Sequence, residues 1–206
     1  MCGRYVVTNP VTKTNKIVKS AIQVEDTENY NAHPYQKLPV IKKYINGNTL
    51  ENLRWGIVPR WSKKKDFKPF INARLETIDE KTSFKKLIKL HRCVAVADGF
   101  YEWKREEKSK TPHYFLREDK KNIYMAGIFE NDEFCLITER ASENVNIIHH
   151  RQPVILNESD INRYLNLELS GSNFLNECKK TKLRFYEISK EVNKPTNNNI
   201  SLIQKI

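Results

Sequence analysis

Short apolar runs separated by charged turns extend along most of the chain. The first, RYVVT at 4–8, has the β-branched composition of a strand, and several similar runs follow between residues 92 and 140. PVIKKYI and TLENLRWGIV flank Asn46-Gly47-Asn48, a strong signal for a hairpin turn. The pattern predicts a last strand over 185–189.

Helical patterns are fewer. Pro10 lies where a helix over about 11–20 would begin, with Thr8 or Asn9 as its capping residue. Further helices are predicted in the segments 79–90, 159–169 and 173–179. Two stretches are predicted as connections: 27–39, which contains two prolines, and the long basic stretch 59–74.

Many short strands with few helices favour an α+β fold, namely a strongly curved, mostly antiparallel sheet or barrel with a few flanking helices. A length of 206 residues suits one domain. We expect that domain to cover residues 2–195, with an Asn-rich C-terminal tail over 196–206.

The charge balance points to an acidic partner. Lys and Arg number 36 against 25 Asp and Glu, a net charge of +11 with a pI near 9.4. Nucleic acid is the first candidate, although a lysine-rich composition could also place positive charge on every surface without any such partner. No apolar run approaches the ~20 residues of a membrane span, and no signal core is visible, so we expect a cytoplasmic, nucleoid-associated protein.

The four cysteines do not form a metal motif. Cys93 and Cys135 lie in apolar runs and are predicted as reduced core residues, and no CxxC pair exists. We therefore expect neither a metal nor a cofactor. Cys2 is different, because removal of Met1 would leave it with a free α-amine and a thiol. Such a 1,2-aminothiol can condense with an aldehyde to give a thiazolidine, while a frayed terminus is the simpler interpretation of Cys2 alone.

Three further segments carry groups suited to chemistry. Asn72 can donate and accept, and Arg74 lies on the same side of an extended segment, unless it only pairs with Glu76. Glu102 stands between two aromatic residues, which would raise its pKa and suit acid–base work, a structural ion pair being the alternative. His149 could shuttle protons near neutral pH, or be an ordinary structural histidine.

Taken together, these segments resemble the SRAP family (SOS response-associated peptidases, abasic-site processing proteins). The similarity runs from residue 2 to the vicinity of Val192. The matching segments are Cys2-Gly3-Arg4-Tyr5, Tyr30-Asn31-Ala32 with Pro34, LRWGIVP at 53–59 with Trp61, Asn72-Ala73-Arg74, GFYEW at 99–103, AGIFE at 126–130, LITE at 136–139 and His149-x-Arg151-x-Pro153.

The resemblance implies a specific activity. Cys2 would form a thiazolidine with the ring-opened aldehyde of an abasic site in single-stranded DNA, shielding that site in the DNA damage response. Asn72, Glu102 and His149 would surround Cys2, the last two handling protons. The DNA groove would be lined by Arg4, Asn31, Trp61, Arg74, Thr138 and Arg151.

Two positions depart from the family pattern, His33 before Pro34 and Gln152 after Arg151. Two other functions stay open. One is an N-terminal-nucleophile peptidase or amidase, including an autopeptidase acting at Met1, and the other is a noncovalent single-strand binder. We expect a monomer with no membrane association.

Overall fold

The computed structural model describes residues 2–19, 24–62, 66–107 and 109–206. Its strands are β1 (Tyr5–Thr8), β2 (Glu28–Ala32), β3 (Lys37–Tyr44), β4 (Gly47–Trp55), β5 (Asn72–Arg74), β6 (Arg92–Ala97), β7 (Gly99–Glu106), β8 (Ser109–Arg117), β9 (Ile123–Glu130), β10 (Glu133–Arg140), β11 (Arg151–Pro153), β12 (Ile155–Leu156) and β13 (Leu183–Glu187). Its helices are α1 (Pro10–Thr14), α2 (Leu87–Leu90), α3 (Glu143–Asn146), α4 (Glu158–Leu165) and α5 (Asn173–Glu177), with 3₁₀ turns η1 (Leu75–Thr77), η2 (Lys190–Asn193) and η3 (Ile200–Ile203).

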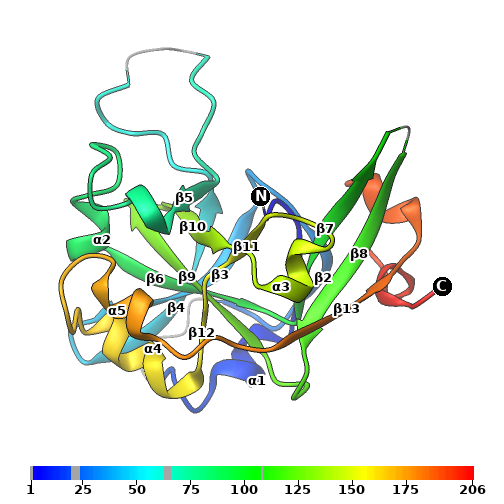
Figure 1. The fold of residues 1–206 in the computed structure, drawn as a ribbon. Coiled ribbons are helices and arrows are strands. Elements are labelled where there is room, and N and C mark those ends of the chain that lie inside the picture. The colour runs from blue at the N-terminus through cyan, green and yellow to red at the C-terminus, as the bar shows by residue number, and fades with distance from the viewer. Residues whose placement is uncertain (1, 20–23, 63–65, 108) are drawn as a thin grey trace.

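The strands form a closed ring and a second sheet beside it (Figure 1). Strand β10 pairs with both β4 and β9, so that the pairings β10–β4, β4–β3, β3–β6, β6–β9 and β9–β10 close on themselves. The five-stranded sheet β13-β8-β7-β1-β2 packs alongside. The predicted α+β fold with a strongly curved, mostly antiparallel sheet is confirmed.

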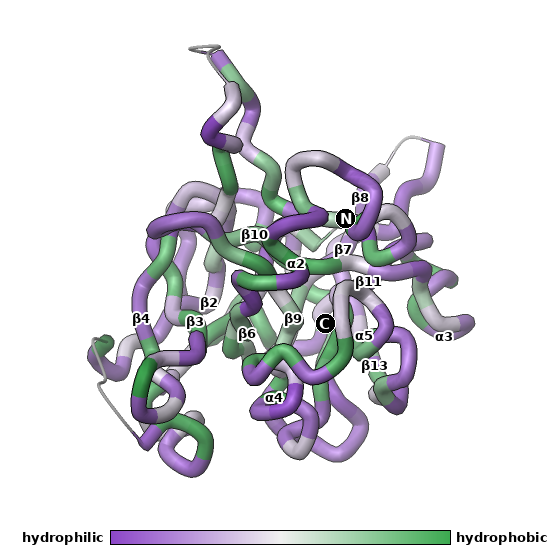
Figure 2. The backbone as a smooth tube through the Cα atoms, turned by 90° about the vertical axis from the view of Figure 1, so that its left-hand side faces the viewer, coloured by the Kyte–Doolittle hydropathy of each residue, from purple (hydrophilic) through white to green (hydrophobic). Residues whose placement is uncertain are grey.

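Hydrophobic burial follows this arrangement. One cluster fills the space between the ring and α4 and α5, around Tyr164 and Phe174, and another joins the ring to the second sheet around Trp55 and Phe100. Figure 2 shows the same division, with hydrophobic segments in the central strands and hydrophilic ones in the outer loops. None of the described helices is long and apolar enough to cross a membrane.

The predicted hairpin is confirmed, since Tyr44 of β3 pairs with Gly47 of β4. The prediction of a loop over 27–39 is wrong, because β2 and the start of β3 lie there and pair with β1 and β4. Pairing with neighbouring strands outweighs the local turn signals of the prolines.

Helix α1 is shorter than predicted and is capped differently. It ends at Thr14, and the side chain of Asn9 makes no capping bond. Instead the carboxylate of Asp26 accepts hydrogen bonds from the backbone N–H groups of Val11 (2.7 Å) and Thr12 (3.2 Å). An acceptor from another part of the chain therefore satisfies the free N–H groups of the first turn.

The segment between β4 and β5 projects from the body of the molecule, at the top of Figure 1. A bridge between Ile57 and Phe70 closes its base. The lysines at 63–65, in the long basic stretch after Trp61, lie outside the described residues, as does Met1.

Residues 196–206, expected to form a tail, pack on the second sheet. Leu202 in η3 is buried, the backbone N–H of Tyr30 donates to Asn198 Oδ1 (2.7 Å), and the hydroxyl of Tyr186 donates to the carbonyl of Ile203 (2.7 Å). The C-terminal residues are thus tied to β2 and β13.

Candidate active site around Cys2

Strand pairing brings the predicted catalytic residues together from distant parts of the sequence. Tyr5 of β1 pairs with Phe100 of β7 in antiparallel register, so Cys2, three residues before Tyr5, lies along β7 near Glu102. Asn72 opens β5, and His149 lies two residues before the start of β11; both strands pair with β10. Residues 2, 72, 102 and 149 therefore converge at one end of the barrel.

Cys2 is fully buried and its backbone is held in place. Asn72 Nδ2 donates to the Cys2 carbonyl oxygen over 2.9 Å. Burial, reinforced by the nearby Glu102 carboxylate, raises the pKa of the Cys2 thiol well above its usual range. The thiol is therefore protonated at neutral pH and needs a base before it can act as a nucleophile.

Glu102 and His149 can provide acid and base. Glu102 Oε1 lies 3.9 Å from His149 Nδ1, and both side chains are largely buried. Burial raises the pKa of Glu102 to about 7 and lowers the pKa of His149 to about 4. At neutral pH the imidazole is uncharged, while the carboxyl is poised to accept or release a proton.

His149 is oriented by the strand that follows it. His149 Nδ1 lies 3.1 Å from both the backbone N–H and the carbonyl oxygen of Arg151, so it can accept from the first or donate to the second. The ring also stacks on His150, with 4.5 Å between centroids. These contacts fix the plane of the imidazole.

A pocket of about 400 Å³ opens beside Glu102 and His149. Trp103 of the GFYEW segment lines it as well, and sequence reasoning missed the rest of its lining: Arg105, Lys110 and Asn193. Arg105 and Lys110 face each other across the β7–β8 hairpin. No motif marks these residues in the sequence, and only the hairpin register shows that two cations stand at the mouth of the site.

Two of the predicted DNA-binding residues hold the C-terminal segment. The Arg4 guanidinium donates to Asn31 Oδ1 (2.7 Å) and to the carbonyl of Val192 (3.0 Å). Asn31 is buried, and its amide donates to the carbonyls of Lys194 (3.1 Å) and Asn197 (2.9 Å). One Arg4 amine and the Asn31 amide are thus engaged within the protein.

Arg151 is likewise engaged. Its guanidinium makes two hydrogen bonds to the Glu76 carboxylate (2.7 and 3.0 Å) and a further one to the carbonyl of Thr138 (2.6 Å). The alternative that Glu76 pairs with Arg74 is wrong, because Arg151 takes that place. The side chain of Arg74 is exposed and makes no hydrogen bond or ion pair within the described part of the chain.

Arg74 lines a second pocket, of about 460 Å³, together with Arg140 and His150. Arg74 and Arg140 come from the neighbouring strands β5 and β10, in which Arg74 pairs with Thr138. Two exposed guanidinium groups near the Cys2 cluster suit a phosphate group. The sequence match found Arg74 but gave no signal for Arg140.

Trp61 lies on the projecting segment and is 58% exposed. Its ring meets Phe67 edge-on at 6.0 Å, and Phe67 in turn contacts Phe70 at 5.1 Å. The aromatic series links the indole to the base of the segment and leaves most of it free to contact a ligand.

Comparison with known proteins decides the family. The sequence model for the SOS response associated peptidase (SRAP) matches residues 1–195. The chain belongs to this family. Its SRAP relatives include the abasic site processing protein YoqW of Bacillus subtilis, 32% identical with 99% of each chain covered, and YedK of Escherichia coli, 31% identical with 83% of this chain and 82% of the relative covered. A solved structure from Bacteroides thetaiotaomicron has the same fold, with a TM-score of 0.82 at 24% identity over the whole of both chains.

The two departures from the SRAP pattern have local roles. Gln152 is buried and donates to Glu139 Oε1 (3.1 Å). It also accepts a hydrogen bond from Ser142 N (2.9 Å), and this bond fixes the start of α3. The backbone N–H of His33 donates to Gln36 Oε1 (3.1 Å) within the turn after β2.

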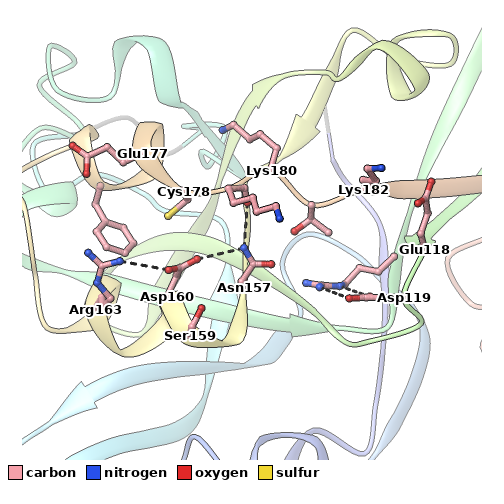
Figure 3. A pocket seen from close by; sticks show the side chains of 14 residues that line it. Glu118, Asp119, Asn157, Ser159, Asp160, Arg163, Glu177, Cys178, Lys180 and Lys182 are labelled. Atoms are coloured by element: carbon pink, nitrogen blue, oxygen red, sulfur yellow. Dashed lines mark hydrogen bonds and ion pairs between the residues drawn. The ribbon is translucent and has the colours of Figure 1, made fainter.

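A larger pocket, of about 670 Å³, lies near α4, α5 and the start of β13 (Figure 3). Several of its charged groups pair with each other: Arg117 with Asp119 (2.7 Å) and Arg163 with Asp160 (3.7 Å). None of the SRAP residues named above is among its described lining, so size alone does not mark the reactive site of this protein.

Proposed function

We propose that the protein captures abasic sites in single-stranded DNA as a covalent thiazolidine on Cys2. The observation that carries this proposal is the cluster itself: Asn72 holds the backbone of Cys2, and Glu102 and His149 lie beside it. The names of SRAP relatives such as YoqW and YedK, abasic site processing proteins, support the choice of substrate.

The proposed reaction begins once Met1 has been removed. The free amine of Cys2 attacks the aldehyde carbon of the ring-opened deoxyribose, and loss of water gives an imine. The Cys2 thiol then adds to the imine carbon, forming the S–C bond, while its proton passes to the nitrogen. The product is a five-membered thiazolidine, and the only by-product is water.

Glu102 and His149 would move the protons in these steps. The carboxylate of Glu102, with a pKa of about 7, accepts a proton from the Cys2 amine or thiol near neutral pH. Neutral His149 can donate a hydrogen bond from its ring N–H to the sugar oxygen as the ring opens. Because the thiol is buried and protonated, a nearby base with a raised pKa suits the second step better than an ordinary carboxylate.

Binding would rely on charge and stacking. The net charge of +11 favours a polyanion, and exposed Arg74 can contact a phosphate. Trp61 offers an exposed ring to an unpaired base. Single strands expose both features at once, which is why we place them ahead of duplex DNA.

The test is a denaturing gel after incubation with a uracil-containing oligonucleotide treated with uracil-DNA glycosylase. The wild-type protein should give a heat-stable adduct, and mass spectrometry should place the DNA remnant on Cys2. Cys2→Ala should abolish the adduct, whereas Cys178→Ala, at a half-buried cysteine, serves as the matched control.

Blocking the removal of Met1 should have the same effect as Cys2→Ala. A full yield of adduct with Cys2→Ala would refute the proposal. Turnover of peptides without any DNA adduct would favour the N-terminal-nucleophile peptidase instead.

A further inference from the structure

Tyr35 has an unusual backbone conformation for an aromatic residue. Its φ is 76°, in the left-handed region, and it follows Pro34 in a turn in which the Gln36 N–H donates to the His33 carbonyl over 3.4 Å. Proline at the second position and a positive φ at the third are typical of a type II turn, whose third position favours glycine. A bulky side chain here is strained, and such strain is concentrated at functional sites.

The ring of Tyr35 is supported on one side and open on another. The Arg54 guanidinium carbon lies 5.3 Å from the ring centroid, and Arg54 is itself held by Glu133 over 2.9 Å. Glu133 also accepts from the backbone of Val58 (2.8 Å), at the base of the projecting segment. Tyr35 nevertheless keeps 48% of its surface exposed.

The ring of Tyr35 packs closely against Gly56. A Cβ atom at Gly56 would lie 3.5 Å from the ring of Tyr35 and 3.1 Å from Pro69. Gly56 has a φ of 134°, so the backbone needs glycine there as well. The ring is therefore set against the base of the projecting segment that carries Trp61.

Strand register places Tyr35 at the same end of the second sheet as Cys2. Tyr5 of β1 pairs with Ala32 of β2, and the strands are antiparallel. Cys2 lies three residues before Tyr5 and Tyr35 three residues after Ala32, so both extend beyond the same end of the pair. Each of the two residues extends about 10 Å at most beyond the Tyr5–Ala32 pair, so both lie at the same end of the sheet.

We propose that Tyr35, backed by Arg54, is a stacking platform for the nucleobase next to the abasic nucleotide. This inference rests on the proposed function and extends it from the sugar to the flanking base. A base lying on the exposed part of the ring gains stacking without any sequence-specific hydrogen bond, and purines, with their larger rings, are held more tightly than pyrimidines. Arg54 stiffens the ring from its other side.

Tyr35→Gly separates this role from a structural one. Glycine removes the ring but suits the positive φ, so the melting temperature should stay the same or rise. Affinity for a single strand with a tetrahydrofuran abasic analogue should fall about five- to 150-fold. Tyr35→Phe should retain binding, and Tyr44→Ala, at another exposed tyrosine, is the matched control.

A 2-aminopurine base placed on either side of the analogue reports stacking directly. The wild-type protein should quench its fluorescence on one side, and Tyr35→Gly should not. Replacing that flanking base by a second tetrahydrofuran should weaken the wild type but not Tyr35→Gly. Unchanged affinity and quenching in Tyr35→Gly would overturn the inference.

The two proposals can fail separately. Tyr35→Gly should still form the adduct with a true abasic site, because it retains Cys2 and the proton-handling residues. If the wild type gives no adduct, the proposed function fails, whatever the stacking experiment shows. If it does give the adduct and stacking is absent, only the role of Tyr35 is lost.

Discussion

Burial shifts Glu102 and His149 in opposite directions, since it disfavours the charged form of each. The pKa of Glu102 rises from 4.5 to about 7, and that of His149 falls from 6.5 to about 4. The folded protein therefore keeps a proton on Glu102 that the unfolded chain has lost, and lacks a proton on His149 that the unfolded chain holds. Each residue makes stability depend on pH in its own window.

Glu102 contributes to the free energy of unfolding below pH 4.5, and this contribution is lost as pH rises through 7. His149 contributes to it above pH 6.5, and its contribution is lost as pH falls through 4. Between pH 4.5 and 6.5 the two slopes oppose each other. In Glu102→Gln only the shifted His149 remains, so we expect the free energy of unfolding to rise with pH in this window. In His149→Gln only the shifted Glu102 remains, so we expect the free energy of unfolding to fall, by on the order of 3 kcal/mol up to pH 7. Urea unfolding across the range measures both, and parallel profiles would contradict the assigned shifts.

The rate of adduct formation should depend on the same carboxyl. In the wild type, ionisation of Glu102 should add about a tenfold rise in rate per pH unit below pH 7 to the rise that deprotonation of the α-amine gives. Glu102→Gln should lose this part of the rise and react roughly 10²- to 10⁴-fold more slowly. Only the rise caused by deprotonation of the α-amine, with a pKa near 7.7–8.0, should remain. A time course of crosslinking at several pH values gives the profile, and an unchanged rise would assign it to another group.

At the scale of elements, Arg151 ties η1 to β10 and β11 through Glu76 and Thr138. Arg151→Ala would leave Glu76 without this partner and should lower the free energy of unfolding by about 2–4 kcal/mol. Arg74→Ala should change it by less than about 0.5 kcal/mol but reduce the salt dependence of single-strand binding by roughly 0.7 in slope. Thermal melting and salt titrations of both variants test these roles. If Arg74 were the structural residue and Arg151 the phosphate contact, the two outcomes would be exchanged.

Local patterns were enough to predict most elements. The strand-like runs became β6 to β10, and the Asn-Gly signal correctly located the β3–β4 hairpin. The capping of α1 by Asp26 and the pairing of Arg151 with Glu76 could not be predicted in this way, because each joins residues that only the folded chain brings together. Likewise the family match named Arg4 and Asn31 but not their engagement with the C-terminal segment.

At the scale of the whole molecule, the C-terminal segment completes the second sheet. Removing residues 196–206 would expose the surface that Leu202 covers and break the bonds from Tyr30, Asn31 and Tyr186. We expect a loss of about 3–5 kcal/mol in the free energy of unfolding. Because Arg4 shares Asn31 with this segment, adduct formation should slow as well. Chemical denaturation of the truncated chain tests the first effect, and an unchanged midpoint would show that residues 196–206 are dispensable.

The contact between Arg4 and Val192 joins the first and last parts of the chain. Cys2 leaves the ribosome before the residues that complete its surroundings, at positions 72, 102 and 149, and Val192 follows roughly 10–40 s after Cys2 at ordinary rates of synthesis. During that interval Cys2 has none of these side chains beside it, and Arg4 is not anchored. If the proposed function holds, a chain whose synthesis stops before Val192 would therefore be a poor trap for cellular aldehydes.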